Sequence, residues 1–166
     1  MLRKIPNSSR ETRCFIQGDA MQVKLNIPTK SQIVNGGFAM TVAPKGGSWS
    51  KSQLGDYADK SGVYIHHSNG RILYIGKATS GAWGTFGERL RREYQETSSS
   101  NSPLHKLLAS QALPIRSFLL DLDELDMIVD AGPMELSPKR KALIMEQVLI
   151  GIFQPEGNLA DQENKD

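Results

Sequence analysis

The segment 139–153 places one carboxylate in the middle of an apolar helix face. At about 100° per residue, the apolar side chains that fall on the side of Glu146 are Ala142, Leu143, Leu149, Ile150 and Phe153. A carboxylate in such surroundings is costly unless a cation neutralises it or it is protonated. The pattern predicts, with equal weight, a salt bridge to a neighbouring Lys or Arg, or an acid that binds a metal or transfers protons.

Two β-rich runs, GVYIHH and RILYIG, are separated by Ser68-Asn69-Gly70, which is typical of a β-hairpin. A three-residue loop would place Tyr64 directly opposite Tyr74, with both phenols on one face of the sheet. A two-residue Asn-Gly turn would shift the register by one and separate them. Tyrosines are also common in strands for packing reasons alone.

A basic helix follows the hairpin. Phe86, Leu90 and Tyr94 recur at i, i+4 and i+8 and predict an amphipathic helix over residues 86–96. Arg89 borders this apolar face and is the arginine best placed to reach a ligand on the sheet. Residues 71–94 contain five basic and two acidic residues, so the local charge of +3 suits a polyanion.

Arg91 points away from the apolar face of the same helix. Arg92 has acidic residues four positions away on both sides, Glu88 and Glu96, which predicts an ordinary surface ion pair. Lys77 follows the glycine that ends the second hairpin strand.

The elements predict an α+β fold with a small antiparallel three-stranded central sheet flanked by helices. Thr85 with Glu88 forms a capping-box pattern, and the Ser-Pro pairs at 102–103 and 137–138 start two further helices. The run IRSFLLDL is a buried strand. We expect an N-terminal extension with short strands at residues 1–60, one domain at 61–160 and a disordered tail at 161–166, with flexible segments at 1–20 and 96–102.

Composition limits the function classes. The chain has 166 residues, 39% hydrophobic and 23% charged, and its 20 Lys and Arg against 18 Asp and Glu give a formal charge of +2. This charge argues against non-specific coating of nucleic acid, although a local basic cleft remains compatible with it. One cysteine and three histidines disfavour a disulfide and a structural zinc site. No stretch is apolar enough for a membrane span, no secretory signal is evident, and we expect a reducing cytoplasm.

These residues together resemble the GIY-YIG nuclease superfamily over about residues 62–159. The two name-giving motifs appear as Gly62-Val63-Tyr64 and, ten residues later from tyrosine to tyrosine, Tyr74-Ile75-Gly76. In the order of the family motif set, the three further matches are Arg89, Glu146 and Asn158. Lys77 resembles the lysine of the bacterial nucleotide-excision-repair incision subunit.

The resemblance implies a catalytic set for phosphodiester hydrolysis. It makes Glu146 the ligand of one Mg²⁺ or Mn²⁺ ion and Arg89 the residue that holds the scissile phosphate. Tyr64 would orient or deprotonate the attacking water, with its pKa lowered by a nearby cation. Tyr74 would hydrogen-bond the phosphate or the water. Asn158 would brace the loop near the metal ligand or contact the phosphate.

Further substrate contacts are expected from Lys77, His66 and Arg92. The chain departs from the family at Glu93, where a histidine often stands one turn after the arginine. His66 lies two residues from Tyr64 on the same strand face and is the nearest histidine to replace it. The loop before Arg89 is also longer than in minimal members.

The resulting hypothesis is a metal-dependent DNA endonuclease, with a compact restriction-type enzyme as the leading subclass. Its partner would be duplex or branched DNA, and the class suggests a homodimer. A structure-specific, repair or homing-type nuclease is the alternative within this class. A catalytically inactive nucleic-acid-binding module on the same fold is the alternative from another class, and a scaffold that uses the acidic segment 121–135 is a third.

Overall fold

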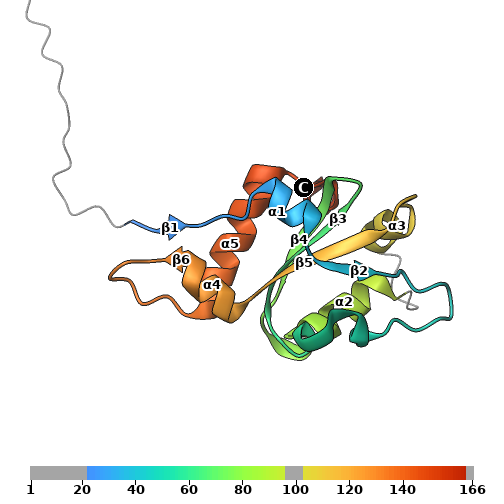
Figure 1. Cartoon of the computed structure of the whole chain (residues 1–166), viewed down its shortest axis with the longest axis horizontal. Coiled ribbons are helices and arrows are strands. Elements are labelled where there is room, and N and C mark those ends of the chain that lie inside the picture. Colours follow the sequence, from blue (N-terminus) through green and yellow to red (C-terminus); the bar gives the residue numbers. More distant parts are fainter. Residues whose placement is uncertain (1–21, 96–102, 164–166) are drawn as a thin grey trace, which may run out of the picture.

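The computed structural model describes residues 22–95 and 103–163, and the chain is an α+β protein with antiparallel sheets (Figure 1). The segments expected to be flexible, 1–20 and 96–102, lie outside the described residues. The elements follow in the order β1 (Lys24–Leu25), α1 (Lys30–Asn35), β2 (Phe38–Met40), η1 (Lys51–Tyr57), β3 (Gly62–Ser68), β4 (Arg71–Ala78), η2 (Gly81–Trp83), α2 (Phe86–Tyr94), α3 (Pro103–Ala109), β5 (Ile115–Asp121), α4 (Leu122–Ile128), β6 (Val129–Asp130), α5 (Pro138–Phe153) and α6 (Glu156–Glu163).

Four strands form the central sheet, in the order β2-β5-β3-β4, where the sequence predicts three. The additional strand is β2, in which Phe38 pairs with Ser117 and Met40 with Ile115 of β5. β1 and β6 form a separate two-stranded sheet. The sequence predicts short strands before residue 61, but a run of three strand residues does not specify which neighbour it will join.

The central sheet separates two apolar cores. Successive side chains of a strand point to opposite faces, so Val63 and Ile65 pack in one core while Tyr64 packs in the other. The first core is completed by side chains of α1, α4 and α5, and the second by side chains of η1, α2 and α3. Figure 1 shows α5 and α2 on opposite sides of the sheet. The hairpin of β3 and β4 therefore contacts both helices that carry candidate site residues.

Side-chain caps start two helices where the sequence predicts them. The Thr85 hydroxyl accepts a hydrogen bond from the backbone N–H of Glu88 at the start of α2, and Ser137 caps α5 in the same way. The Glu88 carboxylate pairs with Arg91 at 2.8 Å. The Thr85 cap of α2 is therefore confirmed, but the predicted capping box is not completed, because the Glu88 carboxylate pairs with Arg91. Arg91 also replaces Arg92 as the partner of Glu88.

Three α-helices, α1, α4 and α6, are absent from the sequence prediction. A capping box starts α4, because Asp121 and Glu124 each accept a hydrogen bond from the backbone N–H of the other. The Asp-x-x-Glu spacing was the available signal. α6 extends to Glu163, so the segment expected to be a disordered tail begins within a helix, and residues 164–166 lie outside the described part.

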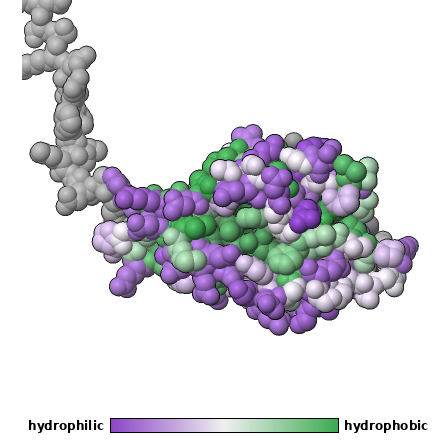
Figure 2. All heavy atoms as spheres, viewed as in Figure 1, coloured by the Kyte–Doolittle hydropathy of each residue, from purple (hydrophilic) through white to green (hydrophobic). Residues whose placement is uncertain are grey.

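The surface carries both polar and apolar regions. Figure 2 shows apolar side chains gathered across the middle of one face. A groove of about 800 Å³ is lined mainly by apolar side chains: Leu25, Ile27, Pro28, Phe118, Leu120 and Ile128. Among residues 22–95 and 103–163, no helix is long and apolar enough to cross a membrane.

Gly37 offers a test of how β2 is held in the sheet. Its φ is +84°, and a Cβ atom there would lie 2.7 Å from the carbonyl carbon of Ser117. Gly46 has a similar φ of +77° with open space around it. We predict that Gly46→Ala costs about 1–2 kcal/mol, from the left-handed backbone alone, and that Gly37→Ala costs clearly more. Urea unfolding of both variants measures this, and equal losses would show that the close approach to β5 is unimportant.

Candidate functional site

The β3–β4 hairpin brings the two motif tyrosines to one face of the sheet. Asn69 and Gly70 have φ values of 50° and 71° and form a two-residue turn, with Ser68 opposite Arg71. The pairing then shifts, so that His66 lies opposite Tyr74 and Leu73 is passed over. A two-residue turn alone would place Tyr64 and Tyr74 on opposite faces of the sheet. The bulge returns both side chains to the same face. Of the two turns that the sequence leaves open, the two-residue turn is therefore the one present.

Tyr64 lies opposite Gly76 and diagonal to Tyr74, with the two ring centroids 6.2 Å apart. A Cβ atom on Gly76 would lie 2.6 Å from Cζ of Tyr64 and would also collide with its hydroxyl. The glycine of the second motif is thus required by the space that the tyrosine of the first motif occupies.

The hydroxyl of Tyr64 is bound to two side chains of α2. It donates to Oε1 of Glu93 at 2.6 Å and accepts from Nε of Arg89 at 3.1 Å. Arg89 Nε also lies 3.2 Å from the same carboxylate oxygen. Tyr64 is 0% exposed and Glu93 is 7% exposed. A buried three-way contact between phenol, guanidinium and carboxylate therefore joins β3 to α2.

His66 contacts the second carboxylate oxygen of Glu93. Its Nε2 lies 2.9 Å from Oε2 of Glu93, and its Nδ1 lies 2.8 Å from Oγ of Ser117 and 3.1 Å from the hydroxyl of Tyr94. Both ring nitrogens of His66 thus have partners, one on Glu93 and the other on two hydroxyl groups. His66 is 0% exposed, so the expected direct contact with substrate does not fit its burial, and it supports Glu93 instead.

Burial and the Glu93 carboxylate raise the pKa of Tyr64 well above its ordinary value near 10. Arg89 acts in the opposite direction, but its effect is smaller. Arg89 therefore acts on this pKa in the expected direction, but burial and Glu93 outweigh it and the pKa is raised. Tyr64 stays a neutral phenol that donates to Glu93.

A hollow of about 200 Å³ lies beside this network. Its lining residues come from β4, α2, α5 and the turn between β4 and α2: Lys77, Thr79, Ser80, Trp83, Arg89 and Glu146. Lys77 Nζ donates to Oε2 of Glu146 at 2.8 Å, and Glu146 is 8% exposed. The salt bridge that the helix pattern allowed is thus present, and the same pair faces an open hollow.

Arg89 reaches the hollow from the buried network. All its hydrogen bonds to the described residues use Nε, so the two terminal amino groups are not engaged by this part of the chain. Because Tyr64 and Glu93 hold the guanidinium at one nitrogen, the donors that suit bidentate phosphate binding remain available.

Glu146 suits a divalent cation that is bound by few protein ligands. Among the described residues, no group of three or more His, Cys, Asp or Glu side chains could hold a metal ion. Mg²⁺ is commonly held by one or two carboxylates together with waters and substrate phosphates. Both hydrogen bonds to Glu146 from the described residues end on Oε2. One carboxylate beside two cationic side chains therefore suits a metal that binds together with a phosphate.

Asn158 lies at the outer edge of β4. Its side-chain amide accepts from the backbone N–H of Ile75 at 2.9 Å and donates to the Ile75 carbonyl at 2.8 Å. Ile75 stands between Tyr74 and Gly76, so Asn158 pairs with the backbone of the second motif. It braces this strand edge, and the brace is on β4 rather than on the loop near Glu146.

Arg92 and Trp83 lie together at the rim of the hollow. The guanidinium carbon of Arg92 is 4.9 Å from the centroid of the Trp83 ring. Arg92 is exposed and stacks on the indole. Of its two expected ion-pair partners, Glu88 pairs with Arg91, and Glu96 lies outside the described residues. Glu93 as the centre of the network is not a site prediction from the sequence, although it stands one turn after Arg89.

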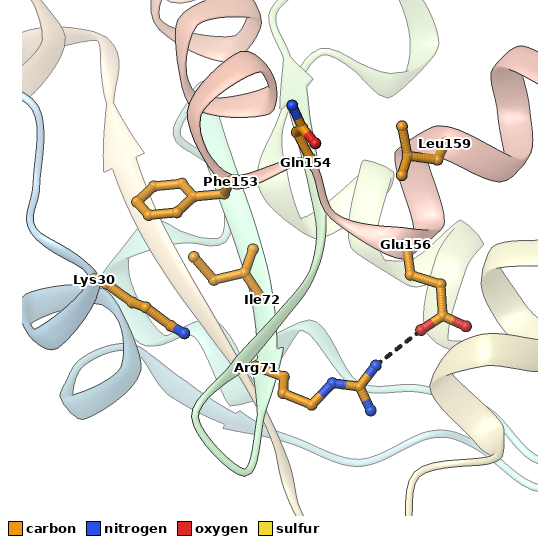
Figure 3. A pocket seen from close by; sticks show the side chains of 7 residues that line it. All are labelled: Lys30, Arg71, Ile72, Phe153, Gln154, Glu156 and Leu159. Carbon is orange, nitrogen blue, oxygen red and sulfur yellow. Dashed lines mark hydrogen bonds and ion pairs between the residues drawn. The ribbon is translucent and has the colours of Figure 1, made fainter.

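A second hollow, of about 520 Å³, lies near the turn end of β4 (Figure 3). Arg71 and Glu156 form an ion pair across it at 3.0 Å, and Lys30 points toward it. None of the predicted site residues lines this hollow. The candidate site is therefore at the opposite end of β4.

No protein-family model, curated protein or solved structure matches this chain.

The buried carboxylate at the centre of the network can be tested by Glu93→Gln, with Glu88→Gln on the same helix as the matched control. We predict that Glu93→Gln lowers the free energy of unfolding by about 1–3 kcal/mol, because charged, buried hydrogen bonds are lost. Glu88 is an exposed ion-pair partner, so its substitution costs about 0–1 kcal/mol. Urea unfolding measures both, and equal small losses would contradict a structural role for Glu93.

The raised pKa of Tyr64 has a pH consequence. The folded state holds the phenolic proton more tightly than the unfolded state, so this group leaves the free energy of unfolding unchanged below about pH 10 and lowers it at higher pH. We predict that the folded wild type and Tyr64→Phe show the same tyrosinate absorbance at about pH 10. About half a tyrosinate more in the wild type, the amount that a tyrosine of ordinary pKa adds at this pH, would contradict the assignment.

Proposed function

We propose that this protein is a metal-dependent endonuclease that hydrolyses phosphodiester bonds in DNA at the hollow lined by Lys77, Arg89 and Glu146. The observation that carries the proposal is the convergence of these three charged side chains, from β4, α2 and α5, on one small hollow. Two cationic side chains with one carboxylate suit a phosphate diester and a divalent cation at the same place.

Substrate binding in this proposal depends on Arg89 and Lys77. Arg89 presents its terminal amino groups to a phosphate while Nε stays bound to Tyr64 and Glu93. Lys77 exchanges its carboxylate partner for a phosphate oxygen. Both residues then lie where negative charge accumulates as the phosphate takes up a fifth ligand.

Glu146 would hold one Mg²⁺ or Mn²⁺ ion, which when bound polarises the phosphate and stabilises the leaving oxygen. The protein supplies the carboxylate, and the salt bridge with Lys77 orients it before substrate arrives. The hydroxyls of Thr79 and Ser80 line the same hollow and can bind waters there.

The two tyrosines have different places in the proposal. Tyr64 is buried and neutral, and it acts as a positioning residue that fixes Arg89 rather than as a group exposed to the attacking water. Tyr74, which is 8% exposed on the same face, remains the predicted hydrogen-bond donor to phosphate or water. Asn158 is the positioning residue for the strand that carries Tyr74 and Lys77.

We also propose the GIY-YIG fold for this chain. The three strands β5, β3 and β4 would be its central sheet, with β2 as an added edge strand. The collision that a side chain at Gly76 would make with Tyr64 supports the correspondence, since it gives a physical reason for the glycine of the second motif. Two groups of subclasses are considered. One is a restriction-type enzyme that binds duplex DNA as a homodimer, and the other is a structure-specific, repair or homing-type nuclease.

A catalytically inactive nucleic-acid-binding module is the second candidate function, and one observation favours it. Glu93 occupies the expected histidine position and binds the Tyr64 hydroxyl, which removes one candidate base from the site. This module would bind DNA through Lys77, Arg89 and Arg92 in a salt-dependent manner and would not cleave it with any metal.

Nicking of supercoiled plasmid and branched DNA with Mg²⁺ or Mn²⁺ separates the two candidates. We predict that wild-type protein cleaves, and that Arg89→Ala and Glu146→Gln each lower the rate by about 10²–10³-fold, the usual cost of losing one charged contact to the transition state. Arg91→Ala is the matched control, because Arg91 lies on the same helix in an exposed ion pair, and it should retain the wild-type rate.

Cleavage that survives both Arg89→Ala and Glu146→Gln would contradict the assigned site. Binding of DNA by the wild type without cleavage under either metal would contradict the enzyme and favour the binding module.

A further inference from the structure

Beside the charged residues, the hollow has one aromatic wall. Trp83 is the aromatic member of its six lining residues, and its side chain is 37% exposed. It comes from the turn η2, between the strand that carries Lys77 and the helix that carries Arg89. An exposed indole within a phosphate-sized hollow lies within one nucleotide of any phosphate bound there.

Arg92 and the turn itself fix the position of this ring. The Arg92 guanidinium stacks on the indole at 4.9 Å from its centroid. The turn is anchored at its end, because Ser61 Oγ donates to the carbonyl of Gly84 and the N–H of Gly84 donates to the carbonyl of Gly81 at 3.1 Å. The ring is therefore presented by a closed turn, with a cationic side chain beside it.

Trp49 provides the contrast within the same chain. It is 5% exposed and stacks on Tyr94, with an angle of 14° between the rings. Trp49 is thus a packing residue, whereas Trp83 keeps part of its surface free next to charged side chains. An exposed indole with an arginine beside it is the combination that stacks on nucleobases without regard to their sequence.

We propose that Trp83 stacks on a nucleobase adjoining the phosphate held by Arg89 and Lys77, so that the site takes DNA whose bases are unstacked there. This inference rests on the proposed function and specifies its substrate class. In uniform duplex DNA both faces of each base are covered by its neighbours, and exposing one costs free energy. Single strands, flaps and branch points have bases already free, so the site favours the structure-specific subclass over the restriction-type one.

Binding of fluorescein-labelled oligonucleotides, measured by anisotropy in EDTA to prevent cleavage, tests this subsite. One probe is a short single strand and the other is the blunt duplex of the same sequence. We expect Trp83→Ala to weaken binding of the single strand about 5- to 150-fold, the usual effect of losing one stacked base, and to leave the weaker binding of the duplex nearly unchanged. Trp83→Phe, which keeps a ring, should restore most of the affinity.

Two controls make the result specific. Met127→Ala removes another exposed apolar side chain, 75% exposed on α4, and should change neither affinity. A fully abasic single strand of the same length should bind wild type more weakly than the normal strand, whereas Trp83→Ala should bind the two strands about equally. Thermal unfolding of each variant checks that the fold is retained.

The outcomes separate this inference from the function on which it rests. If Arg89→Ala weakens both probes while Trp83→Ala weakens neither, or weakens both equally, the base-stacking proposal is overturned and the phosphate site stands. If Arg89→Ala changes no affinity and the wild type cleaves neither DNA form, the proposed function itself fails.

Discussion

Glu93 is a single carboxylate, buried between the sheet and α2, on which the arrangement of the candidate site depends. One of its oxygens accepts from Tyr64 and Arg89, and the other faces His66. A carboxylate in this position would be strongly destabilising without such partners. Because all three partners are present, the contact holds β3 and α2 in one relative position and directs the guanidinium of Arg89 toward the hollow.

The hairpin supplies the second constraint. The turn at Asn69-Gly70 would place the two motif tyrosines on opposite faces, and the bulge that passes over Leu73 brings them back to one face. Gly76 then leaves room for the Tyr64 ring, and Asn158 pairs with the backbone of Ile75 at the strand edge. Lys77 comes two residues after Ile75, whose backbone Asn158 holds in place. The position of Lys77 is therefore fixed, and its ammonium group contacts Glu146 of α5.

Periodicity and local signals predict the elements that surround the site, but they do not predict its contacts. The Glu146 pattern predicts that a cation or metal accompanies the acid or that the acid is protonated, and Lys77 is the cation in the structure. Sequence reasoning treats Glu93 only as a missing histidine, since nothing local indicates that a helical glutamate will meet Tyr64 and His66 from a strand more than 25 residues away. The bulge and the place of β2 in the sheet also escape prediction, because both depend on pairing between segments that are distant in sequence.

The central claim is that one phosphate and one divalent cation bind together between Arg89 and Glu146. A crystal of the protein with Mn²⁺ and a phosphorothioate oligonucleotide, examined for the anomalous signal of manganese, tests this claim directly. We predict manganese bound directly to a carboxylate oxygen of Glu146, with a phosphate group on the terminal amino groups of Arg89 and Lys77 turned toward that phosphate. Manganese bound elsewhere, with Lys77 still paired to Glu146 and no phosphate on Arg89, would contradict the account.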